Sequence, residues 1–275
     1  LGLGHVLAGG VPLDAVRIAA GRRSAVLPLP AGVAISREVL DMRLIEAAVD
    51  AGVEFRPGVR VSRDAQRSDH EVTVLATGLA GDAPPEPGSR LGAGVMVPAE
   101  LAPAFYEAST IHMATGRGGY VGLVRVEADR LDVAAAFDAA FVKQSGGLGP
   151  AAEAVLGEVG WPVPPGLAEL PWKGTPALTR RRATVAGHRL FVVGDAAGYV
   201  EPFTGEGMAW AVASAAALAP IAARDWHPGL AREWEGVHRR VLGRRQDGCR
   251  VIAKALRHPR VTRFAVRALS AFPVL

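Results

Sequence analysis

The stretch from Leu190 to Met208 constrains the fold more than any other part of the chain. It begins with four apolar residues, Leu190 to Val193, which is the pattern of a short buried strand. A Gly-Asp turn at residues 194–195 follows. The sequence Gly-Glu-Gly at 205–207 then opens an Ala-rich segment that predicts a helix from Met208 to about Ala223. A strand, a carboxylate, a glycine loop and a helix N-terminus thus follow one another along the chain.

This order of elements suits a polyhydroxylated, electron-accepting ligand. Asp195 at a strand end can accept hydrogen bonds from sugar-like hydroxyls, and charge-assisted bonds are the stronger kind. Gly194 and Gly198 let backbone approach a ligand, since they carry no Cβ. The helix N-terminus offers unpaired N–H groups and a partial positive charge, which favour a group that becomes anionic. The alternative is a strand–loop–helix unit with no ligand, as occurs in any α/β core.

Composition sets broader limits. The 275 residues are 49% hydrophobic and 21% charged, so the chain can bury one large core or two linked ones and is not disordered in bulk. The net charge is +4, but arginines are dispersed and aromatics are only 6%, so we expect no nucleic-acid surface. The single cysteine, Cys249, excludes an intrachain disulfide and fits a cytoplasmic location. No Cys/His spacing indicates a metal site, and we find no signal peptide or membrane-spanning segment.

The rest of the chain predicts further elements. Residues 15–19 and 24–27 form a hairpin by pattern, Ser36 caps a helix that runs to about Ala51, and Val53–Phe55 alternates as a strand would. Residues 71–76 predict a strand that ends at Thr77-Gly78, before a Pro-rich linker. A strand-rich region follows from Ser89 to about Lys173. After Ala223 the chain is helical and basic.

The run from Gly194 to Met208 resembles the second flavin-binding motif of the FAD-dependent oxidoreductases that include geranylgeranyl reductases, aromatic hydroxylases and flavin halogenases. The resemblance implies that Asp195 binds the ribityl chain of FAD and that the Pro-x-x-Gly-x-Gly loop surrounds the flavin ring. Gly198 favours the reductase-like branch, since many aromatic hydroxylases have His there. The cofactor-binding residues implied in this run are Gly194, Asp195, Ala196, Gly198, Pro202, Thr204, Gly205, Glu206, Gly207 and Met208.

The same resemblance extends to three other places. Arg37, with Leu40 three positions later, matches an arginine that contacts FAD at the head of a helix; the alternative is a solvated cap residue. Thr77 and Gly78 match a turn beside the cofactor, or form an ordinary left-handed turn. Tyr120 stands where geranylgeranyl reductases carry an aromatic-rich motif near the substrate cavity, although the Trp and Pro of that motif are missing; the alternative is a core or edge tyrosine.

The family normally begins with a βαβ unit that carries Gly-x-Gly-x-x-Gly and holds the FAD pyrophosphate, and this chain has no such fingerprint. We therefore expect Leu1 to lie within a longer natural protein. The fold class implied is mixed α/β, with an N-terminally incomplete, Rossmann-like FAD-binding domain, an inserted β-rich substrate domain and C-terminal helices. The expected divisions are a partial FAD-binding domain (1–84), the substrate domain (85–178), the second flavin motif (179–225) and the helical segment (226–275).

These observations favour an FAD-dependent oxidoreductase that acts on an unsaturated or apolar small molecule, with NAD(P)H as electron donor. The alternatives are a hydroxylase of an aromatic or polyketide substrate and a non-catalytic fragment that has lost its nucleotide-binding unit. No side chain stands out as a general acid or base. Arg180–Arg182 predicts a solvated turn, or else an anion site for the NAD(P)H phosphate. The basic C-terminal helices predict a solvated face, or else peripheral contact with an anionic membrane.

Overall fold

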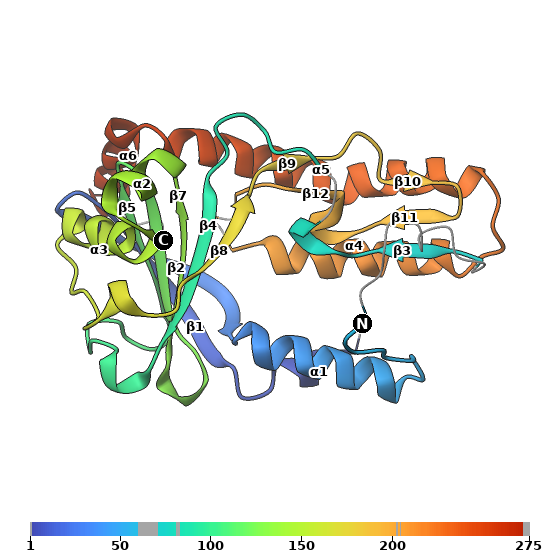
Figure 1. Cartoon of the computed structure of the whole chain (residues 1–275), viewed down its shortest axis with the longest axis horizontal. Coiled ribbons are helices and arrows are strands. Elements are labelled where there is room, and N and C mark those ends of the chain that lie inside the picture. The colour runs from blue at the N-terminus through green and yellow to red at the C-terminus, as the bar shows by residue number, and fades with distance from the viewer. Residues whose placement is uncertain (1, 60–70, 81–82, 202, 204, 272–275) are drawn as a thin grey trace. The chain divides into compact units, whose positions relative to one another are not determined.

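The computed structural model describes residues 2–59, 71–80, 83–201, 203 and 205–271. The chain forms two compact units (Figure 1). The first consists of Leu1–Arg56, Arg90–Thr175 and Ala255–Leu275, and the second of Pro57–Ser89 and Pro176–Lys254.

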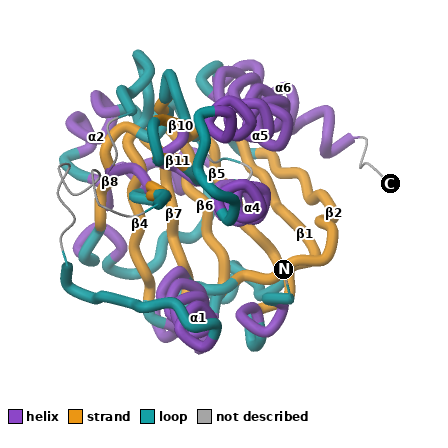
Figure 2. The backbone as a smooth tube through the Cα atoms, turned by 90° about the vertical axis from the view of Figure 1, so that its right-hand side faces the viewer, coloured by secondary structure: helices purple, strands orange, loops and turns teal. Residues whose placement is uncertain are grey.

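A seven-stranded sheet organises the first unit, with the order β2-β1-β5-β6-β7-β4-β8. β1 pairs with β5 in parallel, whereas β1–β2, β5–β6, β6–β7 and β7–β4 are antiparallel. Figure 2 shows the strands from β4 to β2 running side by side. The strands are β1 (Val11–Ala20), β2 (Arg23–Ala34), β4 (Leu91–Val97), β5 (Thr110–Gly116), β6 (Gly119–Arg125), β7 (Leu131–Phe137) and β8 (Lys173–Ala177).

Helices cover both faces of this sheet. α3 (Leu148–Val159), which follows α2 (Ala139–Ser145), packs against β5 and β6, and its core includes Ala19 of β1. α6 (Pro259–Ala271) packs against β1 and β2, where Val266 contacts Ala20 and Ala25. Successive side chains of a strand point to opposite faces, so the neighbours Ala19 and Ala20 belong to two different cores.

The helix predicted after Ser36 is confirmed as α1 (Arg37–Asp50). The Ser36 Oγ accepts a hydrogen bond from the Val39 N–H at 3.3 Å, which is the N-cap arrangement. The strand predicted at Val53–Phe55 is wrong. These residues are irregular and exposed, and in the described part of the chain they pair with no strand.

The second unit is built on a three-stranded sheet with the order β10-β11-β3, in which β11 (Leu190–Val192) runs parallel to β3 (Thr73–Leu75). Its core joins Phe191 and Val192 of β11 to Trp234 of α5, whose indole N–H donates to the Val192 carbonyl at 3.2 Å. The remaining elements are β9 (Arg180–Arg181), β10 (Ala186–Gly187), β12 (Gly198–Tyr199), α4 (Gly207–Ala222) and α5 (Gly229–Leu256).

The mixed α/β fold class expected from the sequence is confirmed. The predicted hairpin is present as β1–β2, but it pairs with β5 and so shares one sheet with the strand-rich region at 91–137. The basic C-terminal region contributes α5 and α6, and residues from Ala255 onward belong to the first unit. Within the described residues, no helix combines the length and apolar character that crossing a bilayer requires.

Candidate functional site

Two turns lie side by side at the carboxyl edge of the parallel pair β3–β11 in the second unit. β3 leads into Thr77 and a 3₁₀ turn, Gly78–Ala80, while β11 leads into a second 3₁₀ turn, Gly194–Ala197. The Val193 N–H donates to the Leu75 carbonyl at 3.0 Å, so the two strands stay paired up to the turns, and the turns contact each other. In open α/β sheets, ligands bind outside the carboxyl ends of strands. The half-buried Asp195 lies at this edge.

The turn that carries Asp195 is fixed by the helix behind it. The Gly194 N–H donates to the Ser214 Oγ at 3.0 Å, and that hydroxyl donates to the Ala211 carbonyl at 2.8 Å. Gly194 has a φ of +59°, and a Cβ there would lie 3.4 Å from the Ala211 Cβ. The small side chains of α4 thus let the strand end approach the helix closely.

Gly198 lies where two backbone segments approach each other closely. It has a φ of +139°, and a Cβ there would lie 3.4 Å from the Arg180 carbonyl oxygen. β12 pairs antiparallel with β9, with Gly198 opposite Arg181 and Tyr199 opposite Arg180. The absence of a side chain at Gly198 therefore lets β12 pass close to the backbone of β9.

Arg180 is also not simply part of a solvated turn. Its guanidinium donates to the Ala177 carbonyl at 2.9 Å and to the Ala83 carbonyl at 3.1 Å. Its side chain ties the start of β9 to a segment almost a hundred residues earlier. The run of arginines thus supports the strand on which the Gly198 segment rests.

The glycines near the N-terminus of α4 and in the Gly78 turn differ in how much space surrounds them. Gly205 has a φ of +72° and Gly78 a φ of +59°, and a Cβ at either position would meet no heavy atom within 4 Å. In contrast, a Cβ at Gly207 would lie 3.3 Å from the Tyr199 ring, and the Cys249 thiol contacts the Glu206 carboxylate at 3.4 Å. The open space at Gly78 adjoins the turn that carries Asp195, because the two 3₁₀ turns contact each other.

The predicted site residues are divided between the units. Thr77, Gly78, Gly194–Ala196, Gly198 and Gly205–Met208 belong to the second unit. Arg37 belongs to the first, where it pairs with Asp41 at 3.0 Å. Tyr120, in the same unit, is a core residue: it is buried, and the Arg90 guanidinium lies 5.8 Å from its ring centroid. Pro202 and Thr204 fall outside the described residues.

Ser214 is the residue of this site that sequence reasoning missed. It is 1% exposed, and its hydroxyl holds the Asp195 turn. The available signal was its side chain, because Ser214 carries the one hydroxyl in α4, whose other residues are Gly, Ala and larger apolar residues.

Structural comparison finds the same fold in several solved proteins. The chain is similar to a geranylgeranyl bacteriochlorophyll reductase-like protein from Thermoplasma acidophilum, with a TM-score of 0.71 and 16% identity over 94% of this chain and 75% of that one. It is similar to a tryptophan 6-halogenase from Streptomyces toxytricini, with a TM-score of 0.64 and 14% identity over 86% and 63% of the two chains. It also resembles HpxO of Klebsiella pneumoniae in complex with FAD and uric acid, with a TM-score of 0.62 and 17% identity over 98% and 79%.

No family model and no curated protein sequence matches the chain. The similarity therefore lies in the structure, at identities below one fifth. The chain thus shares its fold with a reductase-like protein, a halogenase and a protein solved with FAD bound.

Proposed function

We propose that this chain is a flavoenzyme that binds FAD at the carboxyl edge of β3 and β11. The observation that carries the proposal is the position of Asp195, at the end of a strand whose parallel neighbour ends in Thr77-Gly78. The fold supports it, because the structures it matches include one in complex with FAD.

Within this proposal the described residues have distinct roles. Asp195 accepts hydrogen bonds from ribityl hydroxyls, and charge-assisted bonds of this kind contribute more than neutral ones. The flavin ring lies against the open backbone at Gly78 and Gly205, and the N-terminus of α4 favours negative charge on the ring. Bound FAD supplies two-electron redox chemistry, while the protein orients the reactants.

We further propose that the substrate is an unsaturated or apolar small molecule and that NAD(P)H is the electron donor. The Gly198-Tyr199 pair favours the reductase-like branch. The second candidate is a hydroxylase of an aromatic or polyketide substrate, which the likeness to HpxO in complex with uric acid supports. A non-catalytic flavin-binding chain is the third.

Flavin binding is the first test. The purified chain is titrated with FAD and separately with riboflavin, and the quenching of flavin fluorescence is followed. Asp195→Ala should weaken both ligands about 10- to 100-fold, the loss expected for hydrogen bonds to a charged group. The matched control is Asp247→Ala, which removes an exposed carboxylate from α5. Equal affinity of the Asp195 variant and the wild type would refute the ribityl role.

Electron transfer separates the remaining candidates. The flavin-loaded protein is mixed with NADPH or NADH under anaerobic conditions, with candidate alkenes or aromatic compounds. A reductase consumes the nicotinamide and saturates its substrate without oxygen, whereas a hydroxylase needs oxygen to form product. A loaded protein that accepts no electrons under either condition would leave the non-catalytic alternative.

A further inference from the structure

One outer surface of the first unit is both apolar and basic. It lies on α6, whose buried side packs on β1 and β2 through Val266. On the solvent side Phe264 is 73% exposed and Val261 is 50% exposed. Ala265 and Ala268 are exposed as well. Because residues advance about 100° around a helix, these four form one continuous strip. We call this the α6 apolar strip.

Arginines form a second strip beside the first. Arg260, Arg263 and Arg267 are exposed and recur at intervals of three and four residues, so they lie on one side of the apolar strip. The charge of this region is uniform in sign. From Ala255 to Leu275 the sequence has no Asp or Glu, and its cationic residues are Arg257, Arg260, Arg263 and Arg267.

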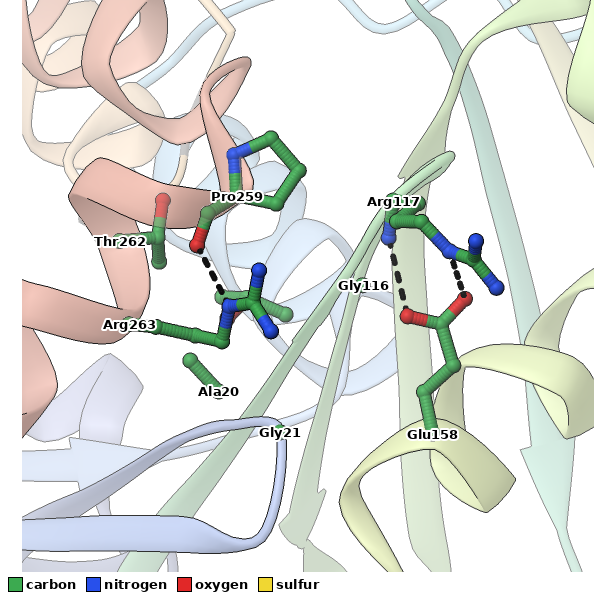
Figure 3. A pocket seen from close by; sticks show the side chains of 9 residues that line it. Ala20, Gly21, Gly116, Arg117, Glu158, Pro259, Thr262 and Arg263 are labelled. Carbon is green, nitrogen blue, oxygen red and sulfur yellow. Dashed lines mark hydrogen bonds and ion pairs between the residues drawn. The ribbon is translucent and has the colours of Figure 1, made fainter.

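The loop beside the first turn of α6 adds to this charge. Figure 3 shows Arg263 extending from α6 toward the β1–β2 turn, while its Nε donates to the Pro259 carbonyl of α6 at 3.2 Å. A Cβ at Gly21 would lie 3.4 Å from the Arg263 Cδ, so this side chain crosses the turn, in which Arg22 and Arg23 follow. A pocket of about 300 Å³ opens here, and on its other side Glu158 pairs with Arg117.

We propose that α6 is a docking surface for an anionic phospholipid bilayer, with the helix lying in the plane of the interface. The apolar strip enters the boundary between headgroups and acyl chains, while the adjacent arginines reach lipid phosphates. This arrangement explains why a phenylalanine is exposed in the middle of an apolar strip that borders a row of arginines. A second copy of the chain is a poorer occupant, because apposed α6 helices would bring like charges together.

Vesicle cosedimentation tests the proposal with the full chain. Vesicles of pure phosphatidylcholine are compared with vesicles that contain about one third phosphatidylglycerol. The chain should bind the anionic vesicles at least tenfold more tightly, and raising the salt from 0.1 M to 0.5 M should weaken that binding, since exposed charges are then screened.

Two variants address the two strips. Phe264→Ser should weaken binding to anionic vesicles about tenfold or more, because it removes the largest group that would enter the bilayer. The control Phe55→Ser, which replaces another exposed phenylalanine, should bind like the wild type. The double variant Arg260→Gln/Arg267→Gln should weaken binding about 25-fold, at roughly fivefold for each arginine. Its control, Arg239→Gln/Arg240→Gln, makes the same change in net charge on α5.

Thermal unfolding of each variant checks that these exposed substitutions leave the fold intact. Equal binding to neutral and anionic vesicles, or an α6 variant that binds like its control, would overturn the proposal. Sedimentation velocity in the absence of lipid gives a further refuting outcome: a wild-type dimer that Phe264→Ser converts to monomer would identify α6 as a protein interface.

Discussion

The hydroxyl of Ser214 offers a sharp test of how the Asp195 turn is positioned. Ser214 lies in the middle of α4, is 1% exposed, and accepts a hydrogen bond from the Gly194 N–H at 3.0 Å. Ser214→Ala removes the acceptor while keeping the helix. The Gly194 N–H then loses its bond at the strand end that presents Asp195.

The magnitude follows from opposing effects. Leaving a buried donor without its acceptor costs about 1–3 kcal/mol of unfolding free energy. The substitution also recovers about 0.5 kcal/mol, because alanine is the better helix former. The net expectation is a loss of about 0.5–2.5 kcal/mol of unfolding free energy. Ser270→Ala is the matched control: its hydroxyl donates to the Arg267 carbonyl at 2.8 Å, as Ser214 does to Ala211, but it lies on the exposed side of α6. That control should be unchanged or slightly stabilised.

Urea unfolding followed by tryptophan fluorescence measures the free energies, and hydrogen exchange of the peptide around residues 190–200 measures protection of the turn. Ser214→Ala should accelerate exchange at Gly194 and weaken FAD binding, while Ser270→Ala should do neither. If both variants lose the same stability and exchange alike, the proposed support of the Asp195 turn by α4 is wrong.

Other predictions concern the first unit. Gly119→Ala should lower the free energy of unfolding by about 3 kcal/mol or more, because the φ of Gly119 is +155° and a Cβ there would lie 2.2 Å from a carbonyl oxygen of β7. Gly94→Ala is the control, since a Cβ at Gly94 meets only an ordinary contact at 3.5 Å. Thermal melts compare the two variants. Burial and a nearby arginine lower the pKa of His112 to about 4, below its ordinary value of 6.5. The unfolded state therefore takes up the proton first as the pH falls, and stability should drop by on the order of 3 kcal/mol between about pH 6.5 and 4; His112→Phe should remove this slope in urea unfolding. Asp138→Ala should lower the free energy of unfolding by about 1–3 kcal/mol, because it removes the carboxylate that pairs at 3.2 Å with the buried Arg90. The double variant Asp138→Ala/Arg90→Met should recover part of that loss.

Local sequence signals predicted the local parts of this structure. The apolar run at 190–193, the Gly-Asp turn and the Ala-rich helix appear in the expected order, and Ser36 caps α1 as its position indicated. These features depend on neighbours within a few residues, so periodicity and capping rules capture them.

Contacts between residues far apart in the sequence could not be predicted from such local rules. The three arginines at 180–182 resemble a solvated turn by composition, yet Arg180 binds the Ala83 carbonyl across 97 residues. The alternation at Val53–Phe55 favours a strand, but a strand also needs a partner, which no local pattern supplies. The pairing of β12 with β9, which places Gly198 opposite Arg181, was likewise not visible in the local pattern.

Hydrogen exchange in the presence of FAD tests the central claim most directly. The chain is labelled alone and with saturating FAD, and the difference is mapped by peptide mass. The flavin site proposed at β3 and β11 predicts that protection concentrates in peptides covering 75–80 and 193–208 and is lost in Asp195→Ala. Protection confined to other segments, or the same protection in the variant, would contradict it.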